Sequence, residues 1–393
     1  MEYNPFFPEV RENPYPYYAY LRQHAPVYQV PGTGFWAVSR YDDVFSIFRS
    51  PQVFSSSVSH SATMGDLNPF PPEAQAIISY DLPEHTRLRK LVNRAFTPRR
   101  VASLETRIRA ITHQLLEPVA TSQEFDLIPT LAAPLPVYVI AELLGVPLER
   151  YADFKRWTDS AVRATSGANI SAEERGQLRQ NLNELFSYFR VVIAECRREP
   201  KDHLLSDLVR AEEDNQMLTP AEVLSLAVFL ILAGSETTMN LIANAMIALG
   251  AHPDQFAQVR ANPALVTNVI EETLRYNGPI QTLARQTTQE VECAGTKIPA
   301  GVLVLTLVGS ANHDEQRFVD PERFNITRNT EDHIGFGFGI HFCLGAQLAR
   351  LEAQIALEVL LDRFPRLSQK DGRVEWVESI IVRGPKALPL VAG

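Results

Sequence analysis

The stretch FGFGIHFCLG, residues 336–345, is the most informative part of the sequence. Gly337 and Gly339 permit backbone turns that other residues rarely adopt, and Cys343 follows them. The residues after it, Ala346–Phe364, have the spacing of an amphipathic helix that stops before a proline. Cys343 is therefore expected near the N-terminus of a helix, where unpaired backbone N–H groups and the helix dipole stabilise a thiolate.

A single cysteine before a helix is more often a buried small hydrophobic residue than a metal ligand. The spacing around Cys343 outweighs this alternative, because the stretch resembles the haem-binding loop of the cytochrome P450 haem-thiolate monooxygenases. The matching positions are Phe336, Gly339, Cys343 and Gly345. The resemblance implies that Cys343 is the axial ligand of a haem b iron and that His341 binds a haem propionate.

A long apolar helix is predicted over Pro220–Leu249, and residues 219–222 (TPAE) form a capping box at its start. The stretch Ala233–Thr238 (AGSETT) interrupts the apolar pattern. Hydroxyls that bond back to their own helix and a solvated glutamate would explain such a stretch in an unknown protein. The resemblance implies instead that Glu236 and Thr237 relay protons for cleavage of dioxygen.

In the same stretch, Ala233 and Gly234 would let the helix pass close to the haem. The acid Glu236 and the alcohol Thr237 that follow also help to choose among the possible functions. A haem-dependent peroxygenase or a non-catalytic haem-binding sensor has no evident need for a proton relay, and both stay as alternatives. The favoured function is a monooxygenase that activates O2 and inserts one oxygen atom into an apolar small molecule by hydroxylation or epoxidation.

Several further charged residues match positions of the same family. His85 and Arg89 lie one turn apart on a predicted helix, and by themselves they would indicate a solvated face. The resemblance implies that both bind haem propionates, together with Arg285 and His341.

Glu272 and Arg275 are spaced i and i+3 on another predicted helix. Such a pair is normally a surface bridge that contributes about 0.2–0.5 kcal/mol. The resemblance places them instead in a buried network with Arg323 that supports the cysteine loop.

Composition limits the other possibilities. The 393 residues carry a net charge of −9, which argues against general binding to nucleic acid. Three widely spaced cysteines exclude a disulfide framework, and Cys196 and Cys293 are interpreted as structural. The N-terminus lacks the pattern of a secretion signal, and the apolar run Val223–Ala233 is too short to span a bilayer. We therefore expect a cytoplasmic monomer that does not enter a membrane.

The pattern along the chain predicts a mainly α fold, a single helix-rich triangular domain over residues 1–393 with a small β portion. Strands are expected at Gly34–Ser39 and Val302–Val308, and a long surface connection at Val58–Ile78. The predicted helices are Pro16–His24, His85–Asn93, Arg100–Leu116, Ala141–Leu144, Arg150–Arg163, Ala172–Arg198, Pro220–Leu249, Ala264–Tyr276 and Ala346–Phe364.

The sequence shows no glycine loop of the flavin type, so electrons are expected from separate proteins, a ferredoxin or flavodoxin with its NAD(P)H-dependent reductase. A local group of basic residues could receive an acidic donor, although clustered cations more often mark a solvated helix face. The group comprises Lys90, Arg94, Arg99, Arg100 and Arg350.

Overall fold

The computed structural model describes the chain except residues 58–66, 68–69, 71–72, 166–169, 214–215 and 371. Helices dominate the described residues, which confirms the predicted fold class. The chain divides into two compact units, and the single domain over residues 1–393 stays a prediction. Unit 1 comprises Met1–Val58, Thr112–Ala132 and Thr237–Gly393, and unit 2 comprises Ser59–Ile111 and Ala133–Glu236. Most of the predicted connection Val58–Ile78 lies outside the described residues.

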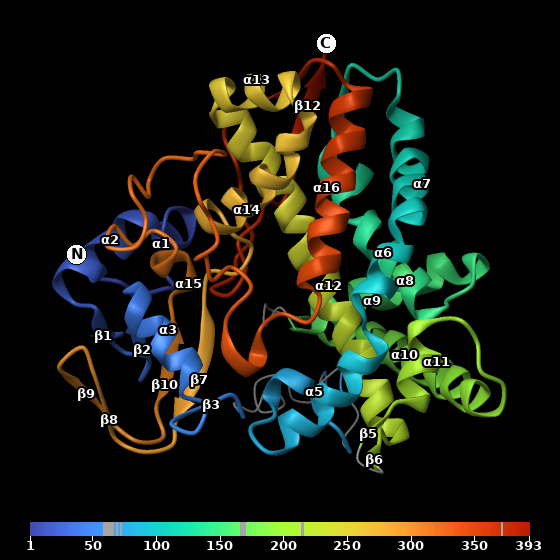
Figure 1. Ribbon diagram of the computed structural model, residues 1–393, viewed down its shortest axis with the longest axis horizontal. Coiled ribbons are helices and arrows are strands. Elements are labelled where there is room, and N and C mark those ends of the chain that lie inside the picture. Colours follow the sequence, from blue (N-terminus) through green and yellow to red (C-terminus); the bar gives the residue numbers. More distant parts are fainter. Residues whose placement is uncertain (58–66, 68–69, 71–72, 166–169, 214–215, 371) are drawn as a thin grey trace. The chain divides into compact units, whose positions relative to one another are not determined.

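Unit 1 holds most of the strands and the C-terminal helices (Figure 1). Its helices are α1 (Pro8–Glu12), α2 (Tyr15–His24), α3 (Tyr41–Arg49), α13 (Pro253–Ala261), α14 (Val266–Tyr276), α15 (Val308–Ala311) and α16 (Ala346–Arg363). Four single turns are η3 (Glu117–Val119), η4 (Ile128–Ala132), η6 (Pro263–Leu265) and η7 (Gly339–His341). Its strands are β1 (Val27–Gln29), β2 (Trp36–Val38), β3 (Phe54–Ser55), β4 (Glu124–Asp126), β7 (Leu283–Thr287), β8 (Val291–Cys293), β9 (Thr296–Ile298), β10 (Leu303–Thr306), β11 (Leu367–Gln369) and β12 (Pro389–Ala392).

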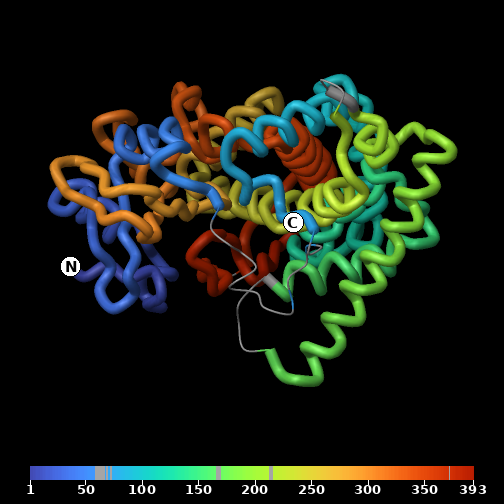
Figure 2. Tube along the Cα trace, turned by 90° about the horizontal axis from the view of Figure 1, so that it is seen from below, coloured from blue at the N-terminus to red at the C-terminus, as the bar shows by residue number. Residues whose placement is uncertain are grey.

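The main sheet of unit 1 has the strand order β1-β2-β10-β7-β3. The N-terminal strand β2 pairs in parallel with β10, and β10 pairs antiparallel with β7. The N-terminal elements and the β7–β10 segment therefore lie side by side, in blue and orange (Figures 1 and 2). Smaller sheets have the orders β11-β12-β4 and β8-β9.

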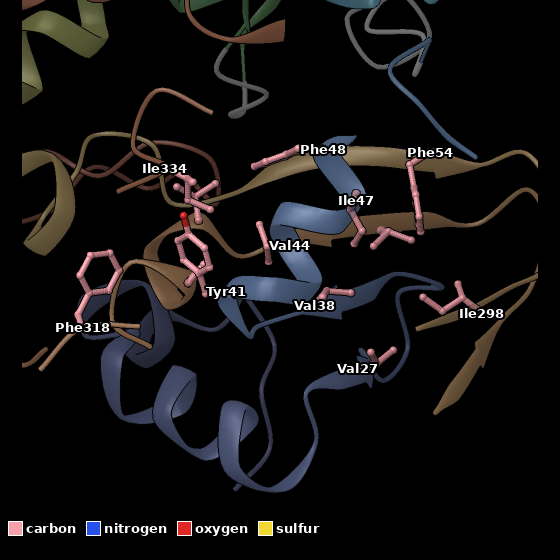
Figure 3. Close-up of a cluster of buried hydrophobic side chains, with 13 residues drawn as sticks. Val27, Val38, Tyr41, Val44, Ile47, Phe48, Phe54, Ile298, Phe318 and Ile334 are labelled. Atoms are coloured by element: carbon pink, nitrogen blue, oxygen red, sulfur yellow. The ribbon is translucent and has the colours of Figure 1, made fainter. Parts of the chain in front are cut away.

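A buried cluster joins α3 to this sheet and to the segment before the cysteine loop. Val44, Ile47 and Phe48 of α3 point into the cluster, which also contains Val38 of β2 and Ile334 (Figure 3). The apolar spacing of α3 makes this face, because residues three and four apart share one side of a helix. Helix α3 is thereby fixed beside the segment that leads to Cys343.

Unit 2 is almost entirely helical. Its helices are α5 (Glu84–Ala95), α6 (Pro98–Ser103), α8 (Pro134–Leu144), α9 (Tyr151–Thr165), α10 (Ala172–Arg198) and α11 (Leu204–Arg210). It also contains the turns η2 (Ile77–Ser79) and η5 (Leu148–Arg150) and the short hairpin β5 (Glu212–Glu213) and β6 (Gln216–Met217). Helix α10 packs against α9 and α11, and α8 packs against α9.

The boundary between the two units falls within two helices, α7 (Glu105–Leu116) and α12 (Pro220–Ala251). The predicted capping box of α12 is confirmed: the Glu222 N–H donates to Thr219 Oγ1 at 3.2 Å, and the Thr219 N–H donates to Glu222 Oε2 at 2.7 Å. Among the described residues only α12 is long and apolar enough to cross a membrane, yet most of its apolar window is buried within the protein. It is a core helix, as predicted.

The predicted elements were mostly found with small shifts, but three predictions were wrong. The predicted helix Ala141–Leu144 is only the last part of α8, which begins at Pro134. The predicted helix Arg100–Leu116 is two helices, because the chain turns at Leu104 between α6 and α7. The predicted strand Val302–Val308 ends at Thr306, and Val308 begins the short helix α15. The apolar residues are buried both in the strand and in the helix that follows it, so hydrophobicity alone did not show where the strand ends.

Candidate active site

The cysteine loop has the backbone that its glycines predict. Gly337 and Gly339 have φ values of 69° and 73°, in the region that favours glycine. The backbone N–H of Cys343 donates to the carbonyl of Phe336 at 3.0 Å and closes the loop. Helix α16 begins at Ala346, so Cys343 lies just before its N-terminus, as expected.

Phe48 of α3 connects this loop to the strand of Arg285. A Cβ atom added to Gly339 would lie 2.6 Å from the Phe48 carbonyl oxygen, so the loop backbone passes directly against α3. The Arg285 guanidinium lies over the Phe48 ring at 5.4 Å. His341 ends η7, which also contacts α3. Unit 1 thus places Arg285 and His341 beside elements that contact the Cys343 loop.

Helix α14 carries the predicted buried ion pair. Both Glu272 and Arg275 have fully buried side chains, and the two groups form paired hydrogen bonds of 2.8 Å each. The surface alternative is therefore wrong. Arg275 also donates to the carbonyl of Asn312, whose side-chain Oδ1 accepts the backbone N–H of Ile334 at 2.9 Å. The pair thereby supports the segment that enters the cysteine loop.

The second arginine of this network is Arg328, so the assignment of Arg323 was wrong. Arg328 Nε lies 3.3 Å from Glu272 Oε1, whereas Arg323 contributes its backbone carbonyl, which accepts from Arg275 Nη2 at 3.2 Å. The chain turns back after Arg323, and Arg328 donates to the carbonyls of Asp320 and Arg323. Sequence position did not reveal this return of the chain.

The polar stretch of α12 remains helical throughout. Ala233 is exposed, and Glu236 and Thr237, three and four residues later on the same face, are half-buried. Gly234 faces elsewhere: an added Cβ would lie 3.0 Å from Ile140 of α8, so its missing side chain gives room to that helix. Of the two small residues, only Ala233 opens the face that carries the acid and the alcohol.

Glu236 belongs to unit 2, and Thr237 is the first residue of unit 1 on the same continuous helix. Burial raises the pKa of the Glu236 carboxyl above its usual value. A raised pKa lets the group hold a proton closer to neutral pH and release it to a neighbouring acceptor.

His85 and Arg89 lie one turn apart on α5 of unit 2, as predicted. The His85 side chain is buried, and burial together with the charge of Arg89 lowers its pKa to about 4. The imidazole is neutral at neutral pH in this environment. A carboxylate bound beside it would favour the charged form and raise the pKa.

Comparison with known proteins identifies the family. The sequence matches the family model described as Cytochrome P450 over residues 170–388. It is 41% identical over 392 residues to the cytochrome P450 monooxygenase PikC of Streptomyces venezuelae, with 96% of this chain and 91% of PikC covered. The solved structure of cytochrome P450 CYP109Q5 from Chondromyces apiculatus is similar with a TM-score of 0.91 at 43% identity, over 100% of this chain and 98% of that chain. This chain is a cytochrome P450.

The structure of CYP109E1 from Bacillus megaterium in complex with testosterone is also similar to this P450. The TM-score is 0.88 at 36% identity, and 97% of this chain and 99% of that chain are covered. Membership of the family confirms the predicted P450 fold, the haem b cofactor and the haem-thiolate monooxygenase function. The peroxygenase and sensor alternatives are not favoured.

The donor set of this P450 fits a haem. No group of three or more His, Cys, Asp or Glu side chains that could hold a bare metal ion occurs in the described part of the chain. One cysteine before a helix suits a metal that brings its remaining ligands in a macrocycle. Of the predicted donors, Cys343, Arg285 and His341 belong to unit 1, and His85 and Arg89 belong to unit 2.

Arg100 and Arg350, which were predicted to receive a redox partner, both form ion pairs. Arg100 donates to Asp207 at 2.6 Å and to Asp202 at 3.0 Å. Arg350 pairs with Glu271 of α14 at 2.6 Å. Their charges are largely compensated, and a role for these two in docking stays a prediction. The side chains of Lys90, Arg94 and Arg99 are exposed on unit 2.

Sequence reasoning missed Phe48 and Glu271. Phe48 has an ordinary apolar position on α3, and its contacts to the loop are visible only after folding. Glu271 directly precedes Glu272, and only Glu272 has the i and i+3 spacing with Arg275 that indicates an ion pair. A signal for Glu271 existed, since a charged residue that follows the apolar Ile270 lies beside the buried face of an amphipathic helix.

Proposed function

We propose that this P450 oxidises a rigid apolar molecule of steroid size. The observation that carries the proposal is the open face of α12, where Phe229 is half-buried and Ala233 exposed just before Glu236 and Thr237. An apolar surface one turn from an acid and an alcohol would hold an apolar substrate next to the proton donors. The similarity to CYP109E1, whose structure contains testosterone, supports the size class.

In this proposal Cys343 would bind the haem iron, and His85, Arg89, Arg285 and His341 would donate hydrogen bonds to the propionates. When bound, the haem supplies the chemistry by which dioxygen is reduced and cleaved. The loop closed by the Cys343 N–H and the Phe336 carbonyl holds the sulfur at a fixed position. Glu236 would hold a proton, which its raised pKa favours, and Thr237 would pass that proton on through water.

Substrate binding tests the size class. Steroids, fatty acids, terpenes and macrolides are titrated against the purified ferric protein, and the shift of the haem spin state is followed by absorbance. Steroids should give the tightest binding among the four classes. A complete shift with fatty acids and none with steroids would contradict the proposal.

Ligation is tested with the three cysteines, all of which lie in the described part of the chain and none of which forms a disulfide. Cys343→Ser should abolish the red-shifted Soret band of the reduced carbon monoxide complex. Cys196→Ser and Cys293→Ser are the matched controls and should keep it. Retention of the band in Cys343→Ser would show that another residue binds the iron.

We further propose that a separate ferredoxin or flavodoxin with an NAD(P)H-dependent reductase delivers the electrons to a monomeric, cytoplasmic enzyme. The exposed Lys90, Arg94 and Arg99 would steer an acidic donor, and salt would screen this attraction. Charge reversal at Arg94 or Arg99 should slow the first electron transfer at limiting donor without changing substrate affinity. Reversal at the ion-paired Arg100 is the comparison and should slow it less than reversal at Arg99.

A further inference from the structure

Glu271 of α14 holds two side chains from different segments at once. Its Oε1 accepts from Arg350 Nε at 2.6 Å, and its Oε2 accepts from Arg350 Nη2 at 2.9 Å. The same Oε2 lies 2.9 Å from His333 Nε2. Arg350 belongs to α16, and His333 lies in the segment before the cysteine loop. One carboxylate therefore joins two helices to that segment.

The hydrogen bonds around His333 fix the role of each ring nitrogen. The backbone N–H of Gly335 donates to Nδ1 at 3.1 Å, so Nδ1 is the acceptor and Nε2 carries the proton given to Glu271. The chain here lies tightly against α14, because a Cβ added to Gly335 would be 2.8 Å from the carbonyl oxygen of Leu274. His333 has almost no freedom to point elsewhere.

The contacts continue from this group to Cys343. The guanidinium of Arg350 lies over the ring of Phe336 at 4.5 Å, and the ring of His333 is 6.2 Å from the same ring. Phe336 supplies the carbonyl that accepts the N–H of Cys343 at 3.0 Å. Glu271 thus acts on the cysteine through the two side chains that pack against Phe336.

The charge of Glu271 is stable over the working range of an enzyme. Burial raises the pKa of this carboxyl, but the hydrogen bonds from Arg350 and His333 outweigh burial and bring the pKa to about 2. The bidentate pair with Arg350 is therefore maintained at all ordinary pH values.

We propose that Glu271, through Arg350 and His333, is a positioning residue that holds Phe336 so that its carbonyl fixes Cys343 for haem ligation. The inference rests on Cys343 as the thiolate ligand. In this proposal Arg350 has a different role from the docking cation that the sequence predicted. Its charge is paired with Glu271, and its planar guanidinium packs on the ring of Phe336.

The test uses the haem-loaded variants Glu271→Gln, Glu271→Ala and Arg350→Lys. Two quantities are measured: the share of the reduced carbon monoxide complex that has the red-shifted Soret band, and the rate of haem transfer to a scavenging apoprotein. Substitution of groups that support a metal ligand typically costs about tenfold, and we expect haem loss to be about tenfold faster in Glu271→Ala. Glu271→Gln and Arg350→Lys keep part of the contacts and should fall between this variant and the wild type.

Arg363→Ala is the matched control, because Arg363 is on the same helix and pairs with the exposed Glu117. It should equal the wild type in both measurements. The free energy of unfolding of each apoprotein separates positioning from collapse, and Glu271→Gln should change it little while it changes the band. If Glu271→Ala does not fold, Glu271→Gln and Arg350→Lys carry the test.

The experiment distinguishes failure of the Cys343 thiolate assignment from failure of the positioning role of Glu271. If the wild type itself lacks the red-shifted band, the thiolate assignment fails and this inference fails with it. If the wild type has the band and all three variants match it in both measurements, only the positioning role is overturned. An Arg350→Lys variant that alters nothing except a salt-dependent electron-transfer rate would also overturn it and return Arg350 to docking.

Discussion

The Cys343 loop and the Ala233–Thr238 turn of α12 both contain glycine and both serve the haem in our proposal, yet they are held in different ways. The loop takes its shape from distant segments, through Phe48, the Glu271 group and the Arg275 network. The turn is part of a regular helix, and Ser235 bonds back to the Ile231 carbonyl at 2.7 Å. Changes in the support of the loop should therefore affect the stability of the protein or the way it holds haem, whereas changes in the turn should affect chemistry alone.

The largest effect is expected for Arg275→Ala. It leaves the carboxylate of Glu272 buried with only part of its partners, and removing one member of a buried pair costs about 3–5 kcal/mol. Urea unfolding of the apoprotein measures the loss. Lys155→Ala, which breaks the exposed pair with Asp159, is the control and should change stability by less than about 0.5 kcal/mol. Equal losses in the two variants would contradict the comparison.

The two glycines of the loop should differ. Gly339→Ala combines an unfavourable positive φ with a clash against the Phe48 carbonyl, and we expect a loss of about 3 kcal/mol. Gly337→Ala has the same backbone strain, but the atoms nearest to its added Cβ are 4.0 Å away, and it should lose about 1 kcal/mol. Thermal unfolding and haem content check both, and a reversed order would show that the contact with Phe48 does not restrain the loop.

A smaller effect is expected from acid. His313 is buried beside Tyr15 and Tyr276, its Nδ1 bonds to the Gly309 carbonyl at 2.9 Å, and burial followed by the charge of Arg275 lowers its pKa to about 3.

Because the unfolded chain then binds the proton more readily than the folded one, this contribution to stability is full above the ordinary histidine pKa and falls as the pH drops toward 3. The apoprotein should lose about 2 kcal/mol between about pH 7.5 and about pH 4.5, and His313→Asn should lose less over the same range. An identical acid profile in the variant would exclude His313 as the cause.

The smallest change in stability is expected for Thr237→Ala, which lies within the helical turn. The free energy of unfolding should stay within about 0.5 kcal/mol of the wild type, because Thr237 is only half-buried and lies within a continuous helix. The variant should still bind substrate and accept electrons, but it should divert reducing equivalents to hydrogen peroxide. The measurement is product formed per NAD(P)H consumed, and an unchanged ratio would remove Thr237 from the proton path.

The same contrast explains which features could be predicted from the sequence. Local signals sufficed for the glycine backbone of the Cys343 loop, for the capping box of α12 and for helix α10, whose bounds were predicted correctly. The partners of charged residues were harder, because they depend on where the chain returns. Arg328 replaced Arg323 beside Glu272, and Arg350 was found against Glu271. The approach of Gly234 to Ile140 could not be predicted, since Ile140 comes from a helix distant in the sequence.

The parallel pairing of β2 with β10 has a consequence for synthesis on the ribosome. Strand β2 cannot pair with β10 until residues 303–306 have been synthesised. Helix α3 gains its contact with the Cys343 loop, through the Phe48 carbonyl, only later. Unit 2 ends at Glu236, so its helices can assemble first while the early N-terminal segment is still open to solvent. Nascent chains halted before Leu303 should therefore be cut by protease near residues 27–49 and resist cleavage within α8, α9 and α10, and haem capture should come only after the Cys343 loop has been synthesised.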